Sequence, residues 1–261
     1  MQEILINTGS ANTLAGNDIL NGDTGNNLSR LTNKLSGFSN KGTLNTANGN
    51  DIITGIGNSI IYTGNSLSGV YNSGTLNTDG GDDIIRGIRY EGVDHAFEEF
   101  DYDFGYGVYN SQGSTIDIGG GNDLITGISE ARTGSGILAD DNSTINTGDG
   151  NDTITATGKG YGIIIRYGAI IDTGKGKDII TGVATDYGDG IANLSTLDTG
   201  EGNDIITGSN TGTNANERGS GIVNTSTFNT GEGNDIITGS GSVGIYNSST
   251  FNTGEGKLIR S

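Results

Sequence analysis

Short apolar segments alternate with Gly, Asn, Asp and Thr along the whole chain, and three of them recur in a fixed order. In residues 190–207 they read GIAN, TLDT and DIIT, separated by two residues and then by four. Each segment is brief, rich in β-branched residues and bounded by turn-forming residues, a pattern typical of short β-strands. We therefore predict three short strands in each repeat and exclude a helical bundle.

The same unit recurs, with copies of TxNTGxGNDIIT that start at residues 43, 75, 115, 144, 170, 196, 227 and 250. A GIxN-like segment precedes each copy, and nearly all variation in length falls between DIIT and the next GIxN. Three strands per unit suit one coil of a solenoid, each strand pairing with its counterpart in the next coil about 4.8 Å away. The predicted fold is all-β, a parallel β-solenoid like a right-handed β-helix or β-roll, of about eight or nine coils.

The organisation predicted from these repeats is a single rod with two special segments. Residues 1–36 are expected to form an N-terminal capping coil, and residues 37–261 the solenoid, with repeats of 23–40 residues. Residues 88–106 are expected to form an acidic, aromatic loop insertion. Such insertions belong at a surface corner, because their backbone polar groups stay in contact with water.

The inward-facing positions are predicted from a period of two along each segment. They are the residue after Gly in GIxN, the second residue of TxNT and the second apolar residue of DIIT. Every coil has an apolar residue at all three positions. The first apolar residue of DIIT admits a threonine, Thr153, so we expect this row to face outward, as ordinary solenoid packing or as an apolar stripe for a partner.

Composition narrows the function classes. The 261 residues include 49 Gly and no Cys, and 31 acidic against 13 basic residues give a formal charge of −18. This charge repels nucleic acid and anionic lipid and attracts cations. The sequence has no stretch apolar enough for a membrane span and no classical signal peptide. Without Cys and with one His, His95, a metal site has to be oxygen-rich, which favours calcium or magnesium.

The stretch TGEGNDIIT at 199–207 resembles the GGxGxDxUx nonapeptide of RTX-type calcium-binding repeat proteins, with Thr199 in place of the first glycine. The likeness recurs in phase in most coils, and LAGNDILNGDTGNNL at 14–28 resembles a tandem pair with Asn27 in the second aspartate place. One motif per long coil departs from the nine-residue array of that family. The resemblance implies Ca²⁺ ligands at the loop aspartates and glycines, namely Asp18, Asp51, Asp83, Asp123, Asp152, Asp178, Asp204, Asp235, Gly49, Gly81, Gly121, Gly150, Gly202 and Gly233.

Repulsion between the stacked aspartates is a second reason, independent of the resemblance, to expect a bound cation or another stabilising group at this row. Stacked coils place successive aspartates about 5 Å apart, where like charges repel by roughly 3 kcal/mol per pair at an effective dielectric constant of 20. Protonation, hydrogen bonds from loop amides or bound cations could relieve the repulsion, and the alternative to calcium is that each Asp caps its own turn. Lys175 and Lys177 flank Asp178, where an ammonium group could replace a cation. Asparagines that end the GIxN segments are expected to form a structural ladder.

The insertion differs from the rest of the chain, because it interleaves carboxylates with aromatic residues. Its candidate partner-binding residues are Glu91, Asp94, His95, Glu98, Glu99, Asp101 and Asp103. A carbohydrate or protein contact and a solvated loop whose aromatic residues fold back on the solenoid are both open interpretations. Paired carboxylates with a histidine could also serve a β-helix polysaccharide hydrolase or lyase. Catalytic groups of such enzymes come from several coils, and no second cluster is visible, so we do not expect an enzyme.

The sequence thus predicts a calcium-binding structural or adhesive module, extracellular or on the cell surface and exported without a classical signal. RTX-like behaviour implies that external calcium drives folding after export. Expected partners are calcium, surface glycans or other surface proteins, and end-to-end self-association through the terminal coils. A metal-free structural solenoid remains a third interpretation.

Overall fold

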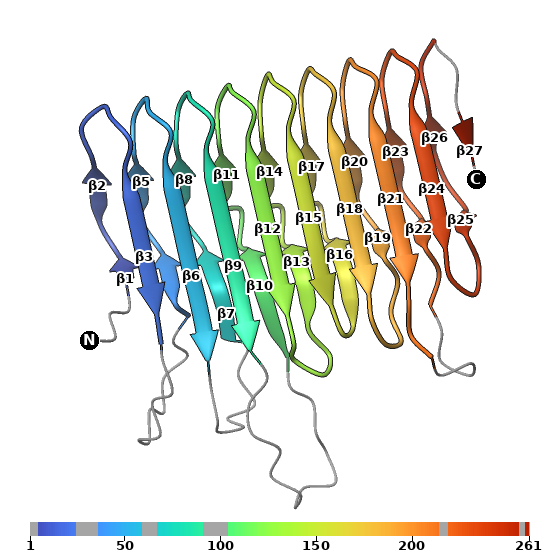
Figure 1. Ribbon diagram of the computed structural model, residues 1–261, viewed down its shortest axis with the longest axis horizontal. Coiled ribbons are helices and arrows are strands. Elements are labelled where there is room, and N and C mark those ends of the chain that lie inside the picture. Colours follow the sequence, from blue (N-terminus) through green and yellow to red (C-terminus); the bar gives the residue numbers. More distant parts are fainter. Residues whose placement is uncertain are drawn as a thin grey trace, which may run out of the picture.

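The structure is a computed structural model that describes residues 5–24, 36–58, 67–90, 104–213 and 219–255, and the backbone of 259–260. In these ranges the chain forms β-strands and no helix, so none of its described segments is a helix that could cross a membrane. The strands make three parallel sheets of nine strands each, and every third strand along the chain enters the same sheet (Figure 1). This is a parallel β-solenoid of nine coils, as the repeats predict.

Sheet A contains the GIxN segments in strands of three to six residues. Its strands are β1 (Leu5–Asn7), β4 (Phe38–Asn40), β7 (Leu67–Asn72), β10 (Gly105–Asn110), β13 (Ser135–Ala139), β16 (Tyr161–Ile165), β19 (Ile191–Asn193), β22 (Ile222–Asn224) and β25 (Ile245–Asn247).

Sheet B contains the TxNT segments in strands of two or three residues. Its strands are β2 (Ser10–Asn12), β5 (Thr43–Asn45), β8 (Thr75–Asn77), β11 (Thr115–Asp117), β14 (Thr144–Asn146), β17 (Ile170–Asp172), β20 (Thr196–Asp198), β23 (Thr227–Asn229) and β26 (Phe251–Asn252).

Sheet C contains the DIIT segments and the residues that follow them. Its strands are β3 (Ile19–Asp23), β6 (Ile52–Asn58), β9 (Ile84–Tyr90), β12 (Leu124–Ser129), β15 (Thr153–Gly158), β18 (Ile179–Ala184), β21 (Ile205–Asn210), β24 (Ile236–Ser240) and β27 (Ile259–Arg260). The glycine-rich loops join sheet B to sheet C along one edge of the rod, which we call the loop edge.

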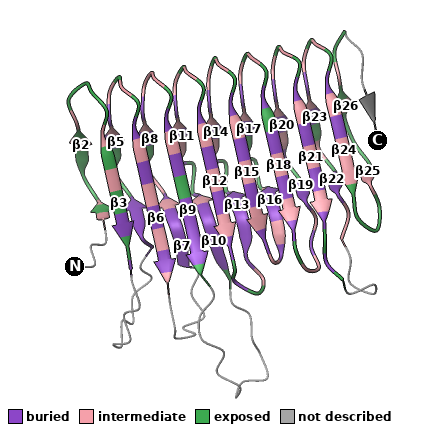
Figure 2. Cartoon of the chain, viewed as in Figure 1, coloured by how far each residue is buried: buried purple, intermediate pink, exposed green. Residues whose placement is uncertain are grey.

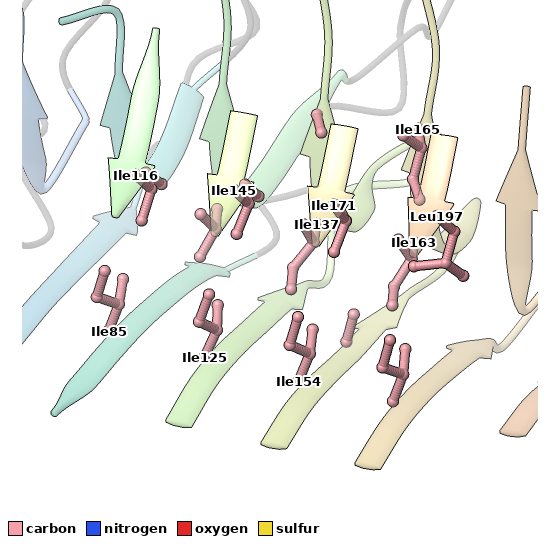
Figure 3. Close-up of a cluster of buried hydrophobic side chains, with 14 of the residues drawn as sticks. Ile85, Ile116, Ile125, Ile137, Ile145, Ile154, Ile163, Ile165, Ile171 and Leu197 are labelled. Carbon is pink, nitrogen blue, oxygen red and sulfur yellow. The ribbon is translucent and has the colours of Figure 1, made fainter. Parts of the chain in front are cut away.

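The core is a stack of apolar rows, one from each sheet, that meet along the axis of the rod. In one coil, Ile116 of β11, Ile125 of β12 and Val108 of β10 are fully buried. Figure 3 shows the isoleucines of neighbouring coils repeating this arrangement. All three predicted inward rows are buried in the interior coils, whereas Ile245 and Phe251 of the last coil are partly buried. The prediction of the core is confirmed.

Sheets A and C meet through glycine at the corner where their strands join. A Cβ atom on Gly127 of β12 would lie 2.2 Å from the carbonyl oxygen of Gly136 in β13. Because no side chain fits into that distance, this corner requires glycine rather than merely tolerating it. Burial alternates along the strands of sheet C because successive side chains point to opposite faces, with Ile125 inside and Thr126 half-exposed outside (Figure 2).

Candidate functional site

The loop aspartates form one buried row at the start of sheet C. Each precedes a sheet C strand directly, and its side chain points into the rod rather than into solvent. Those at most 2% exposed are Asp51, Asp83, Asp123, Asp152, Asp178, Asp204 and Asp235. The first aspartate, Asp18, lies in the same row and is half-buried. We call these eight residues the aspartate ladder.

Hydrogen bonds run along the ladder from coil to coil. The backbone N–H of Asp18 donates to Oδ1 of Asp51 at 2.8 Å, and that of Asp51 donates to Oδ1 of Asp83 at 2.7 Å. The pattern continues without a break to Asp204, whose N–H donates to Oδ1 of Asp235 at 3.1 Å. The donor therefore belongs to the preceding coil and not to the turn of the aspartate itself, unlike the capping arrangement considered from the sequence.

A threonine five positions earlier satisfies the second carboxylate oxygen in most coils. In the third coil from the C-terminal end, the Oγ1 hydroxyl of Thr199 donates to Oδ2 of Asp204 at 2.7 Å. The same bond joins the pairs Thr13–Asp18, Thr46–Asp51, Thr147–Asp152 and Thr230–Asp235. Both carboxylate oxygens thus accept a hydrogen bond from the chain itself in Asp51, Asp152, Asp204 and Asp235.

Three carboxylates of the ladder keep one oxygen without a hydrogen bond, namely Oδ2 of Asp83, Asp123 and Asp178. The hydroxyl of Thr78 donates to the carbonyl oxygen of Ile118 at 2.8 Å instead of to Asp83. Before Asp123 the threonine is replaced by Ile118, which has no donor to offer. An unpartnered buried oxygen is costly, so these coils are the weak points of the ladder.

Burial raises the pKa values of several ladder carboxyls, because a charged carboxylate loses its hydration inside the rod. Burial raises the pKa of Asp123 to about 7, opposed by the hydrogen bond from the Asp83 backbone. Burial also raises the pKa values of Asp178 and Asp204 to about 6, opposed at both by a backbone donor of the preceding coil and at Asp204 by the hydroxyl of Thr199 as well. Burial also raises the pKa values of Asp83 and Asp152.

The predicted glycine ligands pack the loops of neighbouring coils against one another. Their backbone N–H groups donate to loop carbonyl oxygens in the next coil, as from Gly202 to Glu232 at 2.8 Å, and the other five are Gly49, Gly81, Gly121, Gly150 and Gly233. A Cβ atom on Gly202 would lie 1.5 Å from the carbonyl oxygen of Gly176. Glycine is thus required at this position by the distance between adjacent loops.

The donor set fits a calcium ion only in part. In the described ranges, no three acidic or histidine side chains converge as they would around a metal ion. Both oxygens of four ladder carboxylates already accept hydrogen bonds, whereas Asp83, Asp123 and Asp178 each have an oxygen to spare. Calcium at the ladder stays a prediction.

The lysines that flank Asp178 lie at the surface of the loop edge. The ammonium group of Lys175 lies 3.5 Å from Oε2 of Glu201, and both side chains are more than 60% exposed. Such a surface pair contributes little to stability. The backbone N–H of Lys177 donates to Oδ1 of Asn151 at 2.9 Å. Lys175 thus pairs with a surface glutamate of the next coil.

A second ladder, of asparagine amides, joins sheets A and B at their shared corner. Nδ2 of Asn40 donates to Oδ1 of Asn72, and Nδ2 of Asn72 donates to Oδ1 of Asn110, each at 2.8 Å. The same contact recurs from Asn193 through the following coils. Where Ala139 and Ile165 interrupt it, the guanidinium of Arg166 binds both carboxylate oxygens of the buried Asp140. The expected structural ladder is present.

The insertion lies largely outside the described residues. Its candidate residues Glu91, Asp94, His95, Glu98, Glu99, Asp101 and Asp103 all fall in 91–103, and Asn27 falls in 25–35.

Sequence reasoning missed an apolar cluster on the outer face of sheet A. Leu138 and Ile164 are 1% and 8% exposed there, although they alternate with inward residues, and Tyr109 and Tyr161 pack against them. The ring centroids of Tyr106 and Tyr109 are 4.9 Å apart. The signal was the outward row of large apolar residues in the GIxN segments, which a solvent-facing row does not need.

No family model matches this chain, and no curated protein or solved structure matches it either.

Proposed function

We propose that the chain is a structural repeat module, a stiff rod about 40 Å long that spaces or displays other groups. The observation that supports this role is the uninterrupted aspartate ladder, in which each of the first seven coils is hydrogen-bonded to the next through a buried carboxylate. A solenoid gains stability from such nearest-neighbour contacts between its repeats. The chain's own residues form the three sheets, the two polar ladders and the apolar core. The proposed role involves no catalytic step.

An extracellular or cell-surface location and an adhesive use of the rod are part of this proposal. Their support is the resemblance of the loops to RTX-type repeats and the strongly acidic charge of −18. Surface glycans or surface proteins are the partners that such a rod would hold or contact. Export without a classical signal belongs to the same expectation.

Calcium binding at the ladder is a second candidate, favoured by one specific observation. Oδ2 of Asp83 and of Asp123 belong to adjacent coils, are buried and have no hydrogen-bond donor. Oxygen atoms of carboxylates and loop carbonyls are the ligands that Ca²⁺ prefers. A bound ion would neutralise the negative charge there, which protonation otherwise removes.

Calcium titration of the EDTA-treated protein separates the two candidates. Isothermal calorimetry and far-UV circular dichroism would be followed together, with magnesium as the control cation. A metal-free structural rod has its full β-sheet signal in EDTA and gives no heat with calcium. Heat from several ions per chain, with a rise in melting temperature that magnesium does not reproduce, indicates a calcium-stabilised rod.

A substitution in the ladder sharpens the same experiment. In Asp204→Asn the amide oxygen still accepts the N–H of Asp178, and the hydroxyl of Thr199 can turn to accept from the amide. We expect the melting temperature in EDTA to be kept in Asp204→Asn and lowered in Asp204→Ala, which strands a buried N–H at a cost of about 1–3 kcal/mol. Equal losses in both variants would argue against a hydrogen-bonding role for the ladder.

A further inference from the structure

The outer face of sheet C is a flat array of β-branched residues that no other described element covers (Figure 1). Because parallel pairing is in register, each outward position forms a straight row along the rod. The two most exposed members of the first row, Ile19 and Ile179, are 65% and 36% exposed. The first row consists of Ile19, Ile52, Ile84, Leu124, Thr153, Ile179, Ile205 and Ile236.

The middle row of this face is made almost wholly of threonine. It consists of Asn21, Thr54, Arg86, Thr126, Thr155, Thr181, Thr207 and Thr238. Thr126, Thr155, Thr181 and Thr207 are half-exposed and donate no hydrogen bond within the described part of the chain. Their hydroxyls stand in line at the strand spacing of about 4.8 Å. The apolar first row lies on one side of them, and on the other side lies a mixed row that includes Ile88, Ile128 and Val183.

Charge distinguishes this face from the loop edge. Within the described strands of sheet C, the outward positions carry only two charged side chains, Asp23 at the N-terminal end and Arg86 in the middle row. The loop edge, in contrast, exposes Asp149, Glu201 and Glu232. A chain with a net charge of −18 can approach another copy of itself closely only through a surface of this kind.

We propose that the outer face of sheet C is a self-association surface that packs against the same face of a second copy of this chain. Nine strands at about 4.8 Å and six residues at about 3.3 Å make the face roughly 800 Å² in area. That is about the area that each partner of a standard, stable protein interface buries. Two flat sheets with β-branched faces pack about 10 Å apart in β-sandwiches, and opposed threonine rows can hydrogen-bond to each other.

Electrostatics selects one geometry for the pair. A two-fold axis that runs parallel to the rod puts the two acidic loop edges on opposite sides of the dimer, whereas an axis along the strands would put them side by side. In the selected geometry each coil faces the same coil of the partner, so Thr181 lies opposite Thr181. Arg86 then faces Arg86, and this contact is the unfavourable one.

Sedimentation velocity from nanomolar to high-micromolar concentration tests the proposal. Thr181→Lys on the sheet C face is the test variant, and Thr196→Lys on the outer face of sheet B is its matched control. We expect the wild type and Thr196→Lys to form dimers. Thr181→Lys weakens the dimer by on the order of a hundredfold or more, because two ammonium groups are buried without partners. Arg86→Thr tightens the dimer. Circular dichroism and urea unfolding of each variant establish that it is folded.

Cross-linking gives a second readout that does not depend on the lysine variant folding. The chain has no cysteine, so Thr181→Cys and Thr196→Cys each introduce a single thiol. Mild oxidation should give a covalent dimer of Thr181→Cys and not of Thr196→Cys. A wild type that stays monomeric throughout, equal effects of the two lysine variants, or larger species insensitive to Thr181→Lys, which would indicate end-to-end association, each overturn the proposal.

Discussion

The coils that carry Asp123 and Asp152 are neighbours in sheet C and differ at the residue five positions before the aspartate. Both aspartates are buried, and Oδ1 of each accepts the N–H of the preceding ladder aspartate, at 2.7 and 2.9 Å. At Asp152 the hydroxyl of Thr147 also donates to Oδ2 at 2.6 Å. At Asp123 that place is taken by Ile118, and Oδ2 has no partner.

The difference between these two coils shows that burial and hydrogen-bond donors have opposite effects on the pKa of a ladder carboxyl. Burial acts on every carboxyl in the same direction and raises its pKa, whereas each donor lowers the pKa by stabilising the charged form. Asp123 lacks a threonine donor and has a pKa of about 7, while Asp204, which has Thr199 as well as a backbone donor, has one of about 6. The coil of Asp123 is therefore the place where protonation matters most near neutral pH.

The largest expected effect is a fall in stability as pH rises. In the folded chain the pKa values of Asp123, Asp178 and Asp204 are about 7, 6 and 6, above the value of about 3.9 for an unfolded chain. Between about pH 4 and 7 the folded state thus binds more protons, so the free energy of unfolding decreases with pH, at roughly 1.4 kcal/mol per group and pH unit. Urea unfolding from pH 4.5 to 8.5 should show a loss of several kcal/mol.

A matched pair of variants separates the buried ladder from the general charge of the chain. Asp123→Asn and Asp149→Asn each remove one negative charge, but Asp149 is exposed on the loop edge. Asp123→Asn should flatten the pH dependence between pH 6 and 8, and Asp149→Asn should leave it unchanged. Identical profiles for the two variants would assign the effect to overall repulsion rather than to the ladder.

Next in size is Thr147→Ile, which gives the coil of Asp152 the residue found before Asp123. The variant removes the donor to Oδ2 of a buried carboxylate, so we expect a loss of about 2–3 kcal/mol at pH 8 and a smaller loss at pH 5, where protonation relieves the charge. Thr144→Ile in β14, the strand that Thr147 directly follows, is the control, because Ile170 occupies that outward position in the next coil. The control should change stability by less than about 0.5 kcal/mol. A loss in Thr147→Ile that does not vary with pH would point to overpacking.

The core was predictable because its signal is local and repeated. Ile125 and Ile154 belong to segments in which alternation of apolar and small residues identifies the inward side, and the repeat places them one above the other. The outward first position of DIIT followed from Thr153, which a buried apolar row would not admit. These inferences need only the period of a strand and the in-phase spacing of the copies.

The partners of the aspartates were not predictable in the same way. The sequence contains Asp204 in a glycine-rich loop, and a carboxylate there can face a cation, its own turn or a neighbouring coil with equal chemical sense. The choice depends on how far adjacent coils are offset, which brings the N–H of Asp178 to the carboxylate. One sequence signal was available, since a threonine stands five residues before every ladder aspartate except Asp123.

The smallest expected effect is that of Ile118→Thr, which gives the coil of Asp123 the donor that its neighbour has. The new hydroxyl can donate to Oδ2 of Asp123, a bond to a charged group that contributes about 1.5–3 kcal/mol, while the lost apolar burial costs about 1–2 kcal/mol. We expect a net gain of about 1 kcal/mol at pH 8 and a net loss at pH 5, where Asp123 is protonated without help. A carboxyl titration by NMR should show the pKa of Asp123 lowered. A loss of stability at both pH values, with no change in that titration, would mean that the threonine hydroxyls are not what keeps the ladder carboxylates charged.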